Sequence, residues 1–455
     1  MGRVCAGQGN RRSPWGWGTL CGVLLLIFAG SSYLAPSANA VPAFARKYNM
    51  NCNVCHTRFP RLNTFGERFQ ENGYQIPGTE DGGATAKKRL GELTLNDVTN
   101  YLGFRLRGSF NYFTDTGPRS DTSGLEFPQA SEWFIAGTLS KNVGFWIEPE
   151  FSVEEGEASL ERGFVTFNNL GGHDIAHVRL GRFDPSAFWS YSTIRQQIQP
   201  IAAKVTDNGN FMNPTITRIG LGPSAIAAKF SGLFDNAGKA IDPFHEALYN
   251  SHAEMGVDVH GRPFGKAFLY QAGVLNGAGE SFGDSNKQKD WYVMGRLDVA
   301  ESNLFSASLS GMGYFGNNNA KVSTGQNVDW SRYGVAGNVR YGMLDVSAAY
   351  TLDRITRLPA GTTNFDATAG GLTVTMDALV TDQTLLSARY DQLDAGGELA
   401  SRKSTTILTV QAKHYVWSNL SLSVRDDINL RSPGDSADAR QGFRNAFLLG
   451  FDLAL

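Results

Sequence analysis

Cysteine is nearly absent from this chain: there are four among 455 residues, and two of them, Cys5 and Cys21, lie within the first forty. A fold held together by several disulfides is therefore excluded. Proline is also scarce, at 16 residues, whereas glycine reaches 52 and phenylalanine 29. Many glycines with many aromatics are more typical of a protein of strands and turns than of a helical enzyme.

The N-terminus has the features of a secretory signal peptide. Arg3, Arg11 and Arg12 give it a basic start, and the apolar run Leu20–Gly30 is too short to span a bilayer comfortably. Small residues then lead up to Ala40, so we predict that residues 1–40 are a signal peptide cleaved after Ala40. The mature chain keeps 38 basic and 43 acidic residues and contains no long apolar helix. This balance gives no support for nucleic-acid binding.

The two remaining cysteines belong to one motif, Cys52-Asn53-Val54-Cys55-His56. CxxCH is the attachment signature of c-type haem: two thiols bond to the haem vinyl groups, and the following histidine becomes the proximal iron ligand. The alternative is a disulfide or a thioredoxin-like redox pair. That reading expects a strand before the motif and a long helix after it, and it gives His56 no role. We therefore predict one covalent haem c held by Cys52 and Cys55, with His56 as axial ligand.

A small helical segment is predicted around this motif, over residues 41–90, with a linker at 91–101. Pro60 suits the first turn of a helix and Gly73 suits its end. An apolar face of Leu62, Phe65 and Phe69 could cover the haem edge or pack on any neighbour. Four basic residues nearby are candidates for haem propionate contacts, Arg46 and Arg58 first among them, or form a solvated fringe: Arg46, Lys47, Arg58 and Arg61. So short a segment needs support from the rest of the chain.

Residues 102–455 show a different pattern, in which apolar residues recur at every second position. In 102–112 and in 143–153, apolar side chains alternate with polar or charged ones, and the chain ends on the same alternation in 447–455. Short and long links alternate between these runs, as in outer-membrane barrels with short periplasmic turns and long outer loops. We count sixteen strands, or eighteen with the weak runs Thr215–Gly222 and Ala225–Gly232. A soluble β-sandwich rarely needs so many long strands in one continuous run.

The predicted fold is thus all-β: a transmembrane outer-membrane barrel, in contact with lipid, that carries a small N-terminal α-helical haem segment. The inward positions of the strands have mixed charge, which fits a lumen that is plugged or crosslinked by ion pairs: Arg105, Arg107, Glu148, Glu150, Arg179, Asp258, Arg262, Asp345, Arg389, Asp391, Arg425 and Asp427. The other histidines are expected at the surface. His245, with Asp242 and Glu246, could bind iron transiently.

The haem segment resembles a known family, the outer-membrane monohaem cytochrome–porin fusions. The resemblance covers about 35 residues and is carried by these: Pro42-Ala43-Phe44-Ala45-Arg46, Cys52–His56 with Thr57, Phe59-Pro60, Leu62, Phe65-Gly66, Phe69 and Gly73-Tyr74. The barrel matches only as architecture. The best-known members oxidise iron, so the resemblance implies extracellular Fe(II) as electron donor and a periplasmic cytochrome or cupredoxin as acceptor.

Three functions therefore remain open. The first is an electron conduit with a lumen-held haem that takes an electron near the outer mouth of the barrel. The second is a porin-like transport barrel with a haem plug or sensor. The third is a conduit for a partner other than iron, or one that runs outward as a reductase. No nucleophile triad, phosphate-binding loop or zinc spacing is present.

Overall fold

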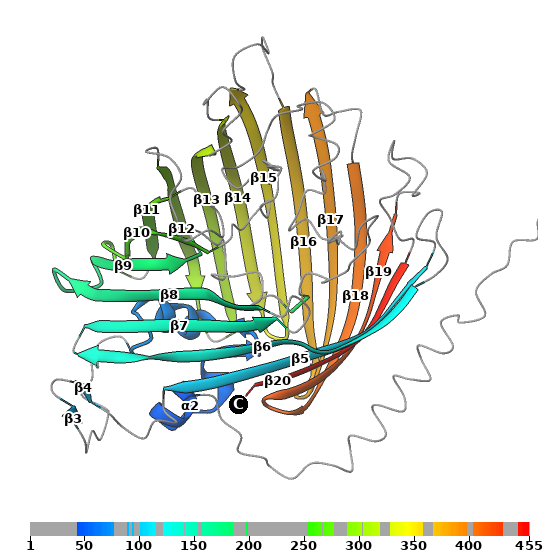
Figure 1. Cartoon of the computed structure of the whole chain (residues 1–455), viewed down its shortest axis with the longest axis horizontal. Helices are drawn as coiled ribbons and strands as arrows, with labels where there is room; N and C mark the ends of the chain where they lie inside the picture. Colours follow the sequence, from blue (N-terminus) through cyan, green and yellow to red (C-terminus); the bar gives the residue numbers. More distant parts are fainter. Residues whose placement is uncertain are drawn as a thin grey trace, which may run out of the picture. The chain divides into compact units, whose positions relative to one another are not determined.

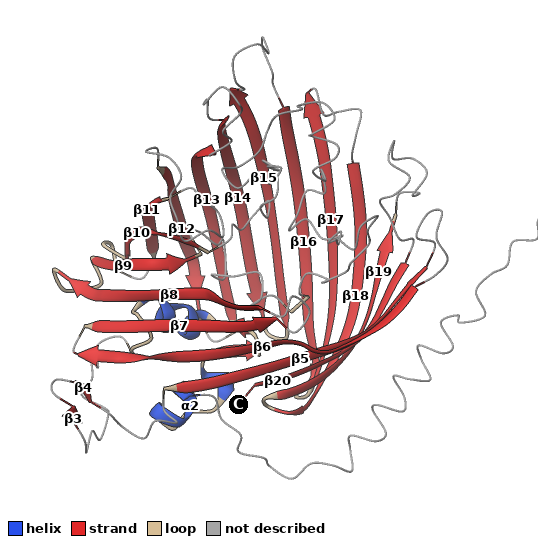
Figure 2. Cartoon of the chain, in the orientation of Figure 1, coloured by secondary structure: helices blue, strands red, loops and turns tan. Residues whose placement is uncertain are grey.

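The computed structural model of this chain describes the following residues: 43–76, 89–90, 93–94, 101–114, 122–140, 142–152, 157–184, 197–198, 253–265, 267–276, 289–302, 304–318, 328–357, 367–397, 404–430 and 445–454. The predicted signal peptide lies outside them. Residues 40–455 form one compact unit. Strands dominate the described residues, and the helices are confined to the N-terminal segment (Figure 2).

Sixteen antiparallel strands close into a barrel, as the alternating pattern predicts. Each strand pairs with its sequence neighbours, and β20 pairs with β5 to complete the ring (Figure 1). The strands are β5 (Leu102–Thr114), β6 (Thr122–Ser140), β7 (Val143–Ser152), β8 (Glu157–Leu170), β9 (Ala176–Phe183), β10 (Glu254–Gly261), β11 (Phe268–Leu275), β12 (Asp290–Glu301), β13 (Phe305–Asn318), β14 (Val328–Tyr341), β15 (Leu344–Arg357), β16 (Ala367–Thr381), β17 (Thr384–Gly397), β18 (Ser404–Trp417), β19 (Leu420–Asn429) and β20 (Asn445–Ala454). Closure leaves no sheet edge unpaired.

The count is sixteen because β9 pairs directly with β10, from Glu254 opposite Phe183 to His260 opposite His177. That ladder leaves no place for two further strands between them. The weak runs Thr215–Gly222 and Ala225–Gly232 lie outside the described residues.

Short links gather at one end of the barrel, which we call the short-turn end. They follow β6, β8, β10, β12, β14, β16 and β18, and the chain also ends there, after β20. The links at the other end are mostly longer, as the sequence predicts. One strand reaches well beyond the alternating apolar pattern: β6 already begins at Thr122, and its first residues pair with β5. A ladder of backbone hydrogen bonds can continue past the apolar band, because it does not require apolar side chains.

The two faces of the barrel wall have opposite character. Apolar side chains point outward and stay exposed, such as Val335 at 58% and Leu180 at 51%, where a lipid bilayer would cover them. Charged side chains point inward and are buried in pairs. Arg105 pairs with Asp452 at 2.7 Å, and Arg425 with Asp427 at 3.0 Å. The expected crosslinked lumen is confirmed.

The N-terminal segment has small elements: α2 (Ala43–Tyr48), the 3-10 helix η1 (Cys52–Val54), β1 (His56–Arg58), β2 (Arg61–Leu62) and α3 (Thr64–Glu71), followed by a hairpin of β3 (Arg89–Leu90) and β4 (Leu93–Thr94). No helix among the described residues is long and apolar enough to cross a membrane. Pro60 lies in the turn of the β1–β2 hairpin, so its predicted place in a helix is wrong. The helix begins later, because Asn63 caps it: its side chain accepts a hydrogen bond from the Gly66 amide.

The segment lies inside the barrel at the short-turn end. Arg58 donates to the carbonyl of Asp382, in the turn after β16, at 2.6 Å. Arg68 pairs with Glu301 at the end of β12. Arg340, near the end of β14, donates to the carbonyl of Leu62 at 3.0 Å. In barrels of this architecture the short turns face the periplasm, so this is the periplasmic end.

Candidate haem site

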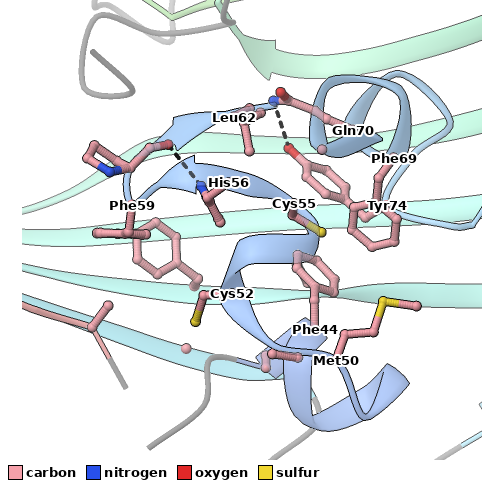
Figure 3. Close-up of a pocket in the computed structure, with 18 of the residues that line it drawn as sticks. Phe44, Met50, Cys52, Cys55, His56, Phe59, Leu62, Phe69, Gln70 and Tyr74 are labelled. Atoms are coloured by element: carbon pink, nitrogen blue, oxygen red, sulfur yellow. Dashed lines mark hydrogen bonds between the residues drawn. The ribbon is translucent and has the colours of Figure 1, made fainter. Parts of the chain in front are cut away.

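The three residues of the predicted haem motif meet in one apolar pocket. Cys52, Cys55 and His56 line it together with aromatic side chains of the segment (Figure 3). Aromatic side chains of the barrel wall line it as well. Its empty space, counted to its open mouth, is about 1300 Å³. The segment contributes Phe44, Phe59, Phe65, Phe69 and Tyr74, and the barrel contributes Phe134 and Trp146. A pocket of this lining suits a large flat apolar group that carries a few polar substituents.

His56 is held in the orientation that a haem ligand needs. Its Nδ1 lies 3.1 Å from the carbonyl oxygen of Pro60, in the turn of the β1–β2 hairpin (Figure 3). A hydrogen bond from Nδ1–H to a carbonyl sets the tautomer in which Nε2 carries the lone pair that binds a metal. The β1–β2 hairpin, which is found where a helix was expected, therefore leaves Nε2 of His56 available to bind a metal.

Asn63 and Gly66 fasten the motif to α3. The side-chain amide nitrogen of Asn63 donates hydrogen bonds to the carbonyl oxygens of Asn53 and Val54, at 3.2 and 3.0 Å. Its backbone N–H donates to the carbonyl of Cys55 at 2.9 Å. A Cβ at Gly66 would lie 2.0 Å from that same carbonyl oxygen, so only glycine allows the helix to approach so closely. Sequence reasoning assigned no role to Asn63, although an Asn three residues before Gly66 is a recognisable cap signal.

A stack of aromatic rings forms one wall of the pocket. Phe44 and Tyr74 are parallel, with centroids 5.3 Å apart, and Tyr74 stacks on Trp146 of β7 at 4.7 Å. Phe44 also meets Phe69 edge to face at 5.2 Å. The predicted apolar face of α3 thus covers the pocket through Phe65 and Phe69. Leu62 contributes from β2.

The cysteines do not have the properties of a redox-active pair. They are not joined by a disulfide, and burial raises the pKa of the Cys55 thiol to about 11. Catalytic CxxC motifs instead lower the thiol pKa, which produces a reactive thiolate. Among the described residues no group of three or more His, Cys, Asp and Glu side chains could hold a metal ion. The apolar lining and the free thiols are compatible with a covalently held haem, which stays a prediction.

The flanking basic residues are engaged with the barrel. Arg46 donates to the Leu102 carbonyl at 2.5 Å, and Arg58 to the turn after β16, and neither lines the pocket. Their contacts with haem propionates stay a prediction. Arg61 is 2% exposed and paired with Asp345 at 3.2 Å, so a solvated fringe is wrong for it. Arg105 is the arginine that lines the pocket.

A network of buried ion pairs, here called the lumen network, ties the segment to the wall. Glu67 of α3 meets Arg296 at 2.7 Å and Arg340 at 3.2 Å. Glu71 meets Arg262 at 2.8 Å. Burial alone would raise the pKa of both carboxyl groups, but the surrounding guanidinium groups outweigh it and hold each pKa below its ordinary value. Both glutamates are therefore ionised at neutral pH.

Three histidines that were expected at the surface are buried instead: His414, near the end of β18, where its Nδ1 lies 3.1 Å from the Thr384 hydroxyl, and His177 and His260, which lie in the lumen. His177 and His260 stack with ring centroids 5.3 Å apart, and each is 3% exposed. His260 lies 2.9 Å from the carbonyl of Glu71, at the end of α3. The prediction failed for His177 and His260 because strand alternation points both inward, where the segment covers them. The possible iron site of Asp242, His245 and Glu246 lies outside the described residues.

Comparison with known proteins gives information about the fold only. No family model and no curated protein matches this chain. Its structure is similar to the outer-membrane channel DcaP of Acinetobacter baumannii, with TM-score 0.52 and 10% identity over 78% of this chain and 96% of that one. It is also similar to Salmonella typhi OmpF, with TM-score 0.50 and 11% identity over 78% and 97%. The fold is therefore that of outer-membrane porin-like barrels.

Proposed function

We propose that this chain is an outer-membrane cytochrome that passes single electrons from extracellular Fe(II) to a periplasmic carrier, a small cytochrome or cupredoxin. The observation that supports it most is the meeting of Cys52, Cys55 and His56 in one aromatic pocket, with His56 Nδ1 bonded to the Pro60 carbonyl. A haem c bound there supplies an iron that changes oxidation state by one electron. In each turnover, Fe(II) becomes Fe(III) and the carrier gains one electron, and no proton is required.

The chain's own residues favour fast one-electron transfer. The rings of Phe44, Phe69, Tyr74 and Trp146 line the pocket and limit the entry of water. The anchoring of the motif by Asn63 fixes the position of His56 relative to the cysteines. Little of this site needs to rearrange when its charge changes by one, because its walls are apolar and packed.

The position of the site changes the expected route. The pocket lies at the short-turn end, so we propose that the electron is taken up there rather than near the outer mouth of the barrel. Val54, between the two cysteines, is 38% exposed, and we propose that the periplasmic carrier approaches the site on this side. The donor must instead travel down the lumen. A small aqueous ion such as Fe(II) is suited to that path, whereas an insoluble mineral is not.

The second candidate is a porin-like barrel with a haem plug. The lumen network favours a fixed plug, because Glu67 and Glu71 are held by three arginines of the wall. A stable plug is compatible with both functions. Measuring the ionic conductance of the full chain in planar bilayers distinguishes the two functions. An electron conduit should pass little ionic current, whereas a transport barrel should pass a current like that of a porin.

Stopped-flow reduction of the oxidised chain in proteoliposomes tests the proposal. Fe(II) is supplied only on the side of the long links, and haem absorbance is followed. We expect rapid reduction, and onward transfer to an oxidised cytochrome enclosed on the other side. If the haem stays oxidised with Fe(II) but is reduced by a small membrane-permeant donor, iron is not the substrate. Reduction by an organic donor from the same side would then indicate a different partner.

A further inference from the structure

Met50 lies on the wall of the haem pocket and has no role in the proposed function so far. It lines the same pocket as Cys52, Cys55 and His56, and Figure 3 shows its thioether beside Phe44 at the edge of that group. Besides the haem motif itself, Met50 is the only sulfur or imidazole side chain among the described lining residues. Thioether sulfur and imidazole nitrogen are the commonest partners of a proximal histidine in electron-transfer haem proteins.

The backbone at the end of α2 places Met50 there. Helix α2 ends at Tyr48, and Asn49 follows with φ of 51°, the left-handed conformation. The Met50 N–H then donates to the Ala45 carbonyl at 2.9 Å, and the Asn49 N–H to that of Arg46 at 3.4 Å. This pair of hydrogen bonds is the Schellman motif, which turns the chain sharply at a helix end. The position of Met50 is therefore fixed by local structure, two residues before Cys52.

The oxygen ligands on the same wall are committed to other contacts. The Tyr48 hydroxyl donates to the Tyr74 carbonyl at 3.4 Å, and the Tyr74 hydroxyl accepts from Gln70 at 3.3 Å. Glu148 accepts from the Trp146 indole at 2.9 Å and pairs with Arg162 at 3.1 Å. Breaking these contacts would leave buried polar groups unsatisfied, which is costly. No such cost applies to a thioether.

We propose that the Met50 sulfur is the second axial ligand of the haem iron. The assignment rests on the proposed function, because it presupposes the haem c of that function. A neutral thioether stabilises the ferrous state relative to a second imidazole and raises the reduction potential. A high potential is what a carrier needs to accept an electron from so weak a reductant as Fe(II). The bond is a coordinate bond, so no electron or proton is transferred when it forms.

The test is spectroscopy of the purified full-length holoprotein and three variants. Met50→Leu keeps the volume and apolar character of the side chain but removes the ligand. Met50→His replaces sulfur with imidazole. Met294→Leu is the matched control, because Met294 is buried on β12 and does not line the pocket. Absorption and electron paramagnetic resonance spectra of the ferric forms are recorded, with the midpoint potential and carbon monoxide binding of the ferrous forms.

The expected wild-type spectrum is low-spin, with the weak long-wavelength sulfur-to-iron charge-transfer band. Met50→Leu should lose that band completely, become high-spin and bind carbon monoxide readily. Met50→His should stay low-spin without the band, at a lower potential. Met294→Leu should match the wild type. If Met50→Leu retains the wild-type spectrum, the assignment is wrong.

Failure of this assignment and failure of the proposed function give different results. If the wild-type protein carries no covalent haem at all, the proposed function fails. If the haem is attached but its spectrum is indifferent to residue 50, only the ligand assignment fails. Should Met50→Leu not fold, Met50→His decides alone, because loss of the charge-transfer band with retained low spin is expected only when residue 50 binds iron.

Discussion

The barrel and the N-terminal segment are stabilised in different ways. In the barrel, every strand pairs with two neighbours, and backbone hydrogen bonds run unbroken around the ring. In the segment, the helices have only six and eight residues, and the two strands of its hairpin have three and two. Helices that short are marginal on their own. The segment contains the predicted haem motif, whereas the barrel supplies the structure that makes the conformation of the segment stable.

We therefore expect that damage to the segment leaves the barrel intact, whereas the fold of the segment depends on the barrel.

Loss of the two cysteines that are predicted to attach the haem should have the largest effect. Cys52→Ala with Cys55→Ala should abolish covalent haem, seen as loss of the haem-stained band on a denaturing gel. The unboiled variant should still migrate differently from the boiled one, as a closed barrel does. A haem-stained band in the double variant would contradict the assignment.

Acid should release the segment while the barrel persists. Because the folded-state pKa values of Glu67 and Glu71 are lowered, their contribution to docking is complete above about pH 4.3, the ordinary carboxyl value. It is lost as pH falls through the lower folded-state values. Pepsin digestion at decreasing pH should cleave within residues 43–76 well before the barrel loses its heat-modifiable migration. Simultaneous loss of both would show that the two regions are not separable.

One half of the lumen network can be removed with a single substitution. Glu67→Gln leaves Arg296 and Arg340 without their shared carboxylate, and breaking a buried ion pair in this way costs about 3–5 kcal/mol. Carbon monoxide access to the haem and protease sensitivity of the segment should both increase. Asp427→Asn is the matched control, because it breaks a buried pair with Arg425 within the wall. Equal effects of the two variants on the segment would argue against the lumen network as its anchor.

A charge on the lipid face should destabilise the barrel and leave the haem site unchanged, and it should have the smallest effect of the four changes. Val335 is 58% exposed near the middle of β14, so Val335→Arg should cost about 2–4 kcal/mol of barrel stability in a bilayer. Val335→Leu should cost almost nothing. Barrel folding into lipid vesicles, read by the heat-modifiable shift, measures the difference. The haem spectrum of the folded fraction should not change, since Val335 points away from the lumen.

Much of the barrel could be predicted from the sequence, because strand periodicity is a local property. Alternation in 102–112 and 143–153 identified which side chains face lipid and which face the lumen. The ends of strands were less predictable, as in β6, since polar residues can belong to either a loop or a continued ladder. The choice of sixteen over eighteen strands needed the direct pairing of β9 with β10.

The sequence by itself determined the alternating strands of the barrel and the motif of two cysteines and a histidine, at the spacing that attachment of a haem c uses. The tertiary structure alone decided where that motif lies. Glu67 and Arg296 lie more than two hundred residues apart, and no local pattern reveals that they meet. The same holds for Arg61 and Asp345, and for the stacking of Tyr74 on Trp146. Covalent motifs are encoded over a few consecutive residues, whereas the position of a segment within a barrel depends on contacts that only closure of the barrel creates.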